Sequence, residues 1–182
     1  MRVGEHAYRT HVESFFQANR HLAEALVADV VERVPEGRPV LDLFGGVGLF
    51  SLPLASGSES VTNVESNRFA VNDARANAKA AEAANLSVRR GAVEDVLGGL
   101  KPQSGECILA DPPRGGLGRR LIGPLVAREP ERIVYVSCDP PALARDLKLF
   151  ADAGYRAEGL SCFDLFPDTF HVETVCQLSR ST

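Results

Sequence analysis

The sequence has no apolar run long enough to cross a bilayer, and its cysteines form no Cys-x-x-Cys pair. A membrane-spanning helix needs roughly 20 predominantly apolar residues, so an integral membrane protein is not expected. The four cysteines, at positions 107, 138, 162 and 176, lack the spacing of a zinc knuckle or an iron–sulfur ligand set. We therefore expect reduced thiols and no metal site.

The start of the chain lacks the apolar core of a secretory signal, because charged residues and histidines interrupt it. A cytoplasmic protein is the resulting expectation. The chain also lacks an excess of basic residues, with 20 Lys and Arg against 24 Asp and Glu and a formal net charge of -4. This balance argues against a surface that is basic throughout, but it is compatible with a local basic patch for RNA.

Internal repeats and low-complexity linkers are also absent. A length of 182 residues corresponds to one domain with a sizeable core, and 45% hydrophobic and 24% charged residues are typical of a globular protein. We therefore expect residues 1–182 to form a single domain, in which residues 1–14 are an extended lead-in.

Strands and helices alternate along the rest of the chain. Short apolar runs predict buried parallel strands, and apolar residues three or four apart predict helices. This alternation favours a doubly wound α/β fold with a mostly parallel seven-stranded sheet and a ligand site at the carboxyl ends of its strands. The predicted strands are 40–44, 61–65, 86–90, 107–110, 133–137 and a closing antiparallel hairpin, 155–163 and 170–178; the predicted helices are 15–34, 50–55, 68–84, 93–100, 117–128 and one after Asp139.

Cys138 lies at the junction between a predicted strand and the helix that follows. Asp139 is a suitable cap for that helix, and Pro140 and Pro141 suit its first turn. A thiol there is close to free backbone N–H groups and to the positive end of the helix dipole, which favour the thiolate. Cys138 is therefore a candidate nucleophile. The alternative is a small buried residue at the end of a strand.

A glycine-rich turn, residues 45–48, follows the first predicted strand of the sheet. Gly46 and Gly48 allow the backbone to approach a ligand closely, although Ser51 stands where a dinucleotide fingerprint has its third glycine. Glu65 ends the next strand and is a candidate ligand for the ribose hydroxyls of a nucleoside cofactor. A tight turn followed by a helix-capping glutamate remains an equally open interpretation.

Three further polar residues are candidates, each with a structural alternative. Asp111 closes the strand at 107–110, where it either contacts a ligand or caps the following turn. Gln17 has the spacing from Ser14 that is typical of a helix capping box. Glu173 interrupts the last strand, where a carboxylate usually points into solvent.

Five segments, in order along the chain, resemble the motifs of the S-adenosylmethionine-dependent RNA uracil-C5 methyltransferases. They run through most of the sequence, and the cysteine and glutamate elements make the match specific. The segments are Phe15-Phe16-Gln17-Ala18-Asn19, Asp42-Leu43-Phe44-Gly45-Gly46-Val47-Gly48, Asp111-Pro112-Pro113-Arg114, Ser137-Cys138-Asp139-Pro140 and Phe166-Pro167-Asp168-Thr169-Phe170-His171-Val172-Glu173.

This resemblance implies a catalytic domain with the Rossmann-like fold of class I methyltransferases. The implied reaction moves a methyl group from S-adenosyl-L-methionine to C5 of a uridine in ribosomal or transfer RNA, without a metal. Cys138 is then the nucleophile that adds to C6, and Glu173 is the base that removes the C5 proton. The implied cofactor contacts are Gln17, Phe44, Glu65 and Asp111, and the turn glycines Gly46 and Gly48 accompany them.

The sequence departs from the family pattern in several places. Leu49 stands where relatives often have Asn, Asp139 where Asn is commoner, and Gly45 where Cys is common. The family's N-terminal oligonucleotide-binding β-barrel, a further β-rich segment and the iron–sulfur cysteines of some members have no counterpart here. The chain thus resembles the catalytic domain alone, and a separate domain or chain is expected to support RNA recognition.

Two other functions remain open. One is a methyltransferase that acts on an exocyclic amine, with the Asp111-Pro112-Pro113 run holding the amino group. The other is a catalytically silent module that binds the cofactor or RNA.

Overall fold

The computed structural model describes residues 1–17, 19, 21–165, 167–169 and 172–181. Helices and strands alternate through these residues, as the sequence predicts. In chain order they are β1 (Arg2–Val3), β2 (His6–Ala7), α1 (Ala23–Arg33), β3 (Pro39–Leu43), α2 (Ser51–Ala55), β4 (Ser60–Glu65), α3 (Arg68–Ala80), β5 (Leu86–Arg90), α4 (Val93–Leu97), β6 (Cys107–Ala110), α5 (Gly118–Val126), β7 (Arg132–Ser137), α6 (Pro140–Asp152), β8 (Tyr155–Phe163) and β9 (Glu173–Arg180).

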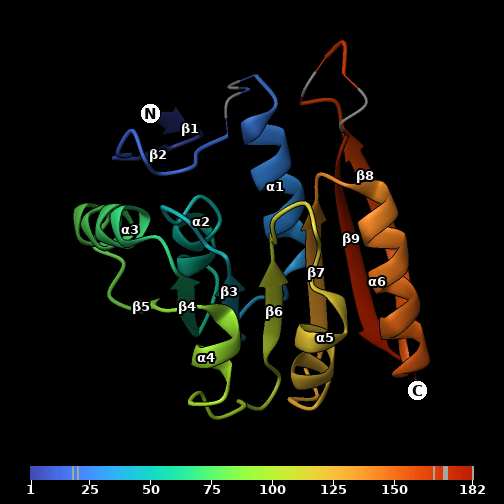
Figure 1. The fold of residues 1–182 in the computed structure, drawn as a ribbon. Helices are drawn as coiled ribbons and strands as arrows, with labels where there is room; N and C mark the ends of the chain where they lie inside the picture. Colours follow the sequence, from blue (N-terminus) through green and yellow to red (C-terminus); the bar gives the residue numbers. More distant parts are fainter. Residues whose placement is uncertain (18, 20, 166, 170–171, 182) are drawn as a thin grey trace.

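Within the described residues, seven strands form one sheet in the order β5-β4-β3-β6-β7-β9-β8 (Figure 1). Strands β3 to β7 are all parallel to one another, and β9 runs antiparallel between β7 and β8. This arrangement confirms the predicted doubly wound, mostly parallel sheet with an antiparallel terminal hairpin. Every residue of β3 and β6 is buried, as expected for strands covered by helices on both faces.

Each face of the sheet has its own hydrophobic core. Along β6, Cys107 and Leu109 join the core that contains residues of α1 and α2, whereas Ile108 and Ala110 join the core that contains residues of α4, α5 and α6. This division follows from the two-residue period of a strand. Full burial of each large aliphatic side chain contributes about 1.5–3 kcal/mol to the free energy of folding, so the two cores stabilise the sheet and the carboxyl ends of its strands.

The N-terminal region differs from its prediction. Helix α1 begins at Ala23 rather than near residue 15, and the capping box of Ser14 and Gln17 does not form. The Ser14 hydroxyl instead donates to Asp73 Oδ2 at 2.9 Å. The side chain of Asn19 accepts the backbone N–H of Leu22 at 3.3 Å, so it supports the chain just ahead of the helix. Tertiary contact with α3 therefore overrides the local helical pattern.

Residues 1–14 are likewise not a plain extended lead-in. β1 and β2 pair as an antiparallel hairpin, and Tyr8 is buried with its hydroxyl donating to Leu49 O at 2.9 Å. In α3, the buried Asn77 accepts from Arg9 N at 2.7 Å and donates to Arg9 O at 3.0 Å. The N-terminal segment is thus bonded to α3 and to the end of the glycine turn.

The remaining element boundaries agree with the predictions to within a few residues. α3 ends at Ala80 rather than 84, and β9 begins at Glu173 rather than 170. Of the predicted family segments, residues 18, 166, 170 and 171 lie outside the described residues. No helix among the described residues has both the length and the apolar character to cross a membrane.

Candidate active site

The glycine turn after β3 has an unusual backbone. Phe44 has a φ of 61°, and Gly46 and Gly48 have φ values of 53° and 90°. Positive φ is uncommon for a residue with a side chain, so the surrounding fold must hold Phe44 in this conformation. A Cβ added at Gly46 would meet no atom within 4 Å. The turn therefore presents its backbone to open space, as a ligand site requires.

Three buried polar side chains lie beneath this turn: Asp42, Ser51 and Asn63. The Ser51 hydroxyl donates to Asp42 Oδ2, and Asn63 Nδ2 donates to Ser51 Oγ at 2.9 Å. A Cβ at Gly45 would clash with the Asn63 side-chain amide, so a larger residue at position 45 does not fit this cluster. Ser51, at the position of the absent third glycine, thus ties the helix after the turn to β3 and β4.

Burial raises the pKa of Asp42 to about 7, although the hydrogen bond from Ser51 opposes the shift. The cluster also contains two buried oxygens, Asp42 Oδ1 and Asn63 Oδ1, with no hydrogen-bond partner in the described part of the chain. Sequence reasoning did not identify Asn63 or the function of Ser51. The available signal was Asp42, a carboxylate within the otherwise apolar and fully buried strand β3, which needs buried polar partners.

Glu65 ends β4 and supports the turn. Its Oε2 accepts the backbone N–H of Gly46 at 3.0 Å, and its Oε1 accepts that of Asn67 at 2.7 Å. A carboxylate has lone pairs for about four donors, and Glu65 is only half-buried, so it can still accept ligand hydroxyls. The predicted ribose contact remains compatible with this geometry.

Gln17 follows the N-terminal segment that is bonded to α3. Its side chain is buried, and its Oε1 has no hydrogen-bond partner among the residues that the structure describes. A buried acceptor without a donor costs about 1–3 kcal/mol, so such an atom indicates a site that a ligand donor completes. This observation fits the residue's predicted role as a cofactor contact.

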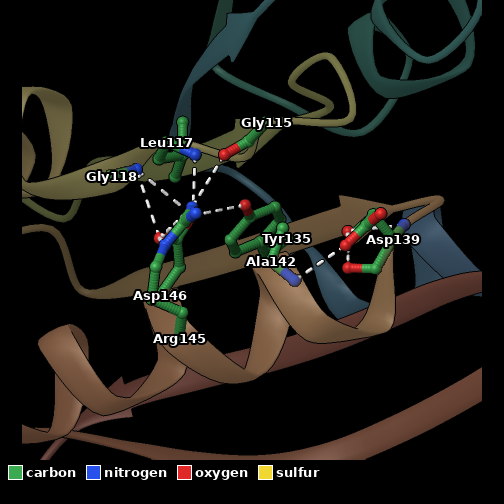
Figure 2. A network of polar contacts seen from close by, with 9 residues as sticks. Gly115, Leu117, Gly118, Tyr135, Asp139, Ala142, Arg145 and Asp146 are labelled. Carbon is green, nitrogen blue, oxygen red and sulfur yellow. Dashed lines mark hydrogen bonds and ion pairs between the residues drawn. The ribbon is translucent and has the colours of Figure 1, made fainter.

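Cys138 lies between β7 and α6 and is half-buried. The predicted cap is confirmed, because Asp139 Oδ1 accepts the backbone N–H of Ala142 at 2.8 Å (Figure 2). The pKa of the Cys138 thiol is nevertheless raised, first by burial and then by the carboxylates of Glu173 and Asp111; Arg114 acts in the opposite direction. The expected preference for the thiolate is therefore wrong for the ligand-free site: burial and negative charge outweigh the helix terminus.

Glu173 is buried at the start of β9, which excludes the structural alternative of a side chain that points into solvent. The antiparallel pairing of β7 with β9 ends at Ser137 and Thr174, so Cys138 and Glu173 are the next residues beyond that pair. Burial raises the pKa of Glu173 to about 7. The carboxylate of Glu173 also raises the pKa of the Cys138 thiol, so the two groups are close enough to interact electrostatically.

Asp111 follows β6, and its backbone N–H donates to Leu43 O at 3.3 Å. The pKa of Asp111 is raised well above its usual value by burial, with further contributions from the charges of Glu173 and Asp42. Asp111 is therefore near Asp42, below the glycine turn, and also near Glu173, next to the Cys138 region. Its neighbour Arg114, which sequence reasoning quoted only as part of a motif, acts electrostatically on Cys138.

A buried acid, Asp146, fixes the loop between β6 and α5 (Figure 2). Its Oδ2 accepts the Leu117 N–H at 2.7 Å and the Tyr135 hydroxyl at 2.8 Å. A Cβ at Gly116 would lie 2.5 Å from that same oxygen, so the loop requires a glycine there. Sequence reasoning missed Asp146, although a carboxylate one position before Leu147 on the sheet-facing side of α6 was a signal. This network anchors the loop that carries Asp111 and Arg114.

The sheet order, the antiparallel strand inserted next to β7 and the glycine-rich turn after β3 define a class I methyltransferase fold. Residues 2–181 match the family described as tRNA (Uracil-5-)-methyltransferase, and the chain belongs to this family. Within the described residues, no group of three or more His, Cys, Asp or Glu side chains is arranged to hold a metal ion.

Similar proteins support this assignment. An uncharacterized RNA methyltransferase of Thermotoga maritima is 41% identical over 171 residues, covering 92% of this chain and 38% of that protein. Another from Streptomyces coelicolor is 41% identical over 182 residues, covering 97% of this chain and 39% of its own length. The chain therefore spans about two fifths of the length of these relatives.

A solved structure has the same fold over nearly the whole chain. It is the tRNA (uracil-54, C5)-methyltransferase of Pyrococcus abyssi in complex with S-adenosyl-L-homocysteine, with a TM-score of 0.85 and 36% identity over 97% of this chain and 43% of that one. The precorrin-6y C5,15-methyltransferase of Geobacter metallireducens has a TM-score of 0.74 at 15% identity, covering 96% of this chain and 93% of its own, which indicates a shared fold alone.

Proposed function

We propose that this chain is the catalytic domain of an S-adenosylmethionine-dependent methyltransferase that modifies C5 of a uridine in RNA. The observation that carries the proposal is the position of Cys138 and Glu173 just beyond the last β7–β9 pair, where the carboxylate acts electrostatically on the thiol. A nucleophilic thiol and a buried base close to it are what methylation of a pyrimidine carbon needs. Membership of the uracil-5-methyltransferase family supports this reaction over other methyl transfers.

The residues around the glycine turn fit the proposed cofactor. When bound, S-adenosylmethionine supplies an electrophilic methyl group on a sulfonium sulfur. Gln17 Oε1, the buried acceptor without a partner, would take a cofactor donor, and Glu65 would accept the ribose hydroxyls. Gly46 and Gly48 leave room for close approach, with Phe44 and Asp111 as neighbouring contacts. The relative from Pyrococcus abyssi, which was solved with S-adenosyl-L-homocysteine, supports this cofactor class.

Cys138 would begin the reaction. After the thiol loses its proton, the thiolate forms an S–C6 bond with the uracil ring, and the displaced electron pair moves toward C5 and the O4 carbonyl. C5 becomes nucleophilic and would form a bond with the methyl carbon, while the bond from that carbon to the sulfonium sulfur would break with its electron pair and leave S-adenosylhomocysteine. Because the pKa of Cys138 is raised in the ligand-free site, its deprotonation depends on pH and on the approach of the substrate.

Glu173 would complete the reaction. The methylated ring still carries a hydrogen on C5, and the Glu173 carboxylate removes it as a proton. The released electron pair restores the C5–C6 double bond while the S–C6 bond breaks and the thiolate leaves. A pKa of about 7 suits this step, since a base is most effective when its pKa lies near the working pH.

The proposed substrate is a uridine that has left its base stack. A ring inside a helix cannot reach a half-buried thiol at a sheet edge, so a single-stranded, loop or flipped uridine is expected. Transfer RNA and ribosomal RNA both offer such nucleotides. A separate RNA-binding domain or chain remains part of the proposal, because this chain spans about two fifths of its relatives.

Incubation with S-adenosylmethionine and RNA containing 5-fluorouridine tests the proposal. Fluorine on C5 cannot be removed as a proton, so a stalled covalent adduct on Cys138 is expected by denaturing electrophoresis and peptide mass spectrometry. Cys138→Ala is the matched control and should form none. If the chain binds S-adenosylmethionine but no adduct forms with ribosomal or transfer RNA, the function is closer to a cofactor-binding module. Transfer that survives in Cys138→Ala would indicate an amine methyltransferase.

A further inference from the structure

A cationic groove lies between α5 and α6, next to the loop that carries Asp111 and Arg114. It has a volume of about 470 Å³, and its lining includes Gly115 from the loop and three exposed cations, Arg119, Arg145 and Lys148. One exposed acid, Asp152, also lines it. The chain as a whole has a net charge of -4, so this concentration of positive charge is local.

Arg145, which lines this groove, is held in position by hydrogen bonds (Figure 2). Its Nη2 donates to Gly115 O at 2.7 Å and to Asp146 Oδ1 at 2.8 Å, while its Nε donates to the same Oδ1 at 3.0 Å. Its side chain still has 51% of its surface exposed. An arginine already fixed by such bonds loses little conformational freedom when it binds an anion, so it is preorganised.

The other two cations have no competing partner. Neither the Arg119 side chain nor the Lys148 side chain forms a hydrogen bond or an ion pair with any residue that the structure describes. The buried Asp146 carboxylate offsets the charge of Arg145 through their ion pair and also accepts N–H groups from Leu117 and Gly118. Arg119 and Lys148 therefore supply the groove's uncompensated positive charge.

The position of the groove relates it to the proposed reaction. The loop that forms one of its walls also carries Arg114, which acts on the Cys138 thiol. A uridine flipped onto Cys138 stays connected to its neighbouring phosphates, and these must pass over the adjacent protein surface. Guanidinium and ammonium groups are the usual partners of phosphate oxygens.

We propose that Arg119, Arg145 and Lys148 bind the phosphate backbone of the RNA next to the methylated uridine. This inference rests on the proposed function and adds a contact surface to it. The groove supplies affinity and orientation without reading bases, since phosphate contacts carry no sequence information by themselves. The catalytic domain thereby contributes its own RNA contacts beside those of any separate RNA-binding domain.

The double variant Arg119→Gln, Lys148→Gln tests the proposal, because both residues lie outside the site and the Asp146 network. The probe is fluorescein-labelled oligouridylate, and its affinity is measured by anisotropy over a series of salt concentrations. Loss of two phosphate contacts on a single strand should reduce the slope of log K against log salt by about 1.4. The matched control is Arg75→Gln, Lys79→Gln, which removes two cations that line a separate cavity against α3. This control should retain the slope of the unaltered chain.

Equal slopes for the unaltered chain and the groove variant would overturn the proposal, as would an equal loss in the control. Absence of salt-dependent binding by the unaltered chain would also overturn it. The 5-fluorouridine adduct separates this result from the function itself. At saturating RNA, the groove variant should still form the adduct on Cys138; an unaltered chain that binds oligouridylate but never forms the adduct would instead reject the reaction.

Discussion

The two parts of the candidate active site place buried acids in different hydrogen-bonding surroundings. In the glycine-turn half, formed by β3, β4 and the turn, burial raises the pKa of Asp42 to about 7 although the hydrogen bond from Ser51 opposes the shift. In the cysteine half, formed by the ends of β6, β7 and β9, burial alone raises the pKa of Glu173 to about 7. Burial is thus the main cause of both shifts, and only Asp42 is held by a polar partner that counteracts it.

The difference indicates a division of tasks. Around the glycine turn, polar side chains hold the backbone in place. Asn77 donates hydrogen bonds to the carbonyl oxygens of Arg9 and Val47, and Glu65 accepts the backbone N–H of Gly46. The cysteine half brings together Cys138, Asp111 and Glu173, whose charges raise the pKa of the thiol. Reactive sites are typically places where burial and like charges shift pKa values. The first half is therefore suited to holding a ligand and the second to chemistry.

Replacing Cys138 by Ala should give the largest difference between the two halves, because methyl transfer should be lost while cofactor affinity is retained. Without the thiolate, C5 of uracil stays unactivated, and methyl transfer to RNA should fall on the order of 10⁴-fold or more. The affinity for S-adenosylmethionine, measured by calorimetry, should stay within about twofold because the thiol lies in the other half. A large loss of cofactor affinity would contradict the proposed division.

Glu173→Gln should give the next largest effect. The variant lacks the base, so turnover should fall about 10²- to 10³-fold while the methylated Cys138 adduct accumulates. In the unaltered protein, the ionised fraction of Glu173 decreases about tenfold per pH unit below pH 7, so activity should rise with pH through that region. The raised pKa of Cys138 extends the rise above pH 7. Normal turnover by the variant would reject this assignment.

The same substitution should change stability in a pH-dependent manner. The pKa of Glu173 rises from 4.5 in the unfolded chain to about 7 in the folded one, so the unfolded state releases its proton first. Folding stability attributable to this group is present below pH 4.5 and is lost as pH rises through 7, by at most about 3 kcal/mol. Glu173→Gln should therefore be more stable than the unaltered chain at pH 8 and similar at pH 4.5, as measured by urea unfolding. A constant difference across this range would refute the proposed burial effect.

Local pattern was sufficient for much of the fold. Apolar runs and the Asp139 cap predicted β6, β7 and the start of α6 correctly, since each depends on neighbouring residues. The predicted start of α1 was wrong, because the conformation of the residues before Ala23 depends on contacts with residues far away in the sequence. Ser14 bonds to Asp73, 59 residues away, and Arg9 bonds to Asn77, 68 residues away. Such tertiary bonds have no local signature.

The site was predictable to the extent that each residue ends a strand. Parallel strands finish at one edge, which gathers Glu65, Asp111 and Cys138 without further information. The electrostatics of the site could not be predicted from the sequence, because the raised pKa of Cys138 depends on its burial and on the nearby carboxylates of Glu173 and Asp111. The Asp146 anchor was missed for a related reason: whether an acid on a helix is exposed or buried depends on the loop that covers it.

Gln17→Ala should give the smallest effect of the series and one confined to cofactor binding. Removal of the amide oxygen deletes an acceptor for the cofactor but leaves the backbone intact, so the dissociation constant of S-adenosylmethionine should rise about tenfold, equivalent to about 1.4 kcal/mol. At saturating cofactor, turnover should be nearly normal, since Cys138 and Glu173 are unchanged. Gln177→Ala, which removes a surface glutamine bonded to Glu158, is the matched control and should alter neither quantity. If Gln17→Ala lowered turnover at saturation while leaving affinity unchanged, the residue would belong to the chemistry of the cysteine half, and the boundary between the halves would have to move.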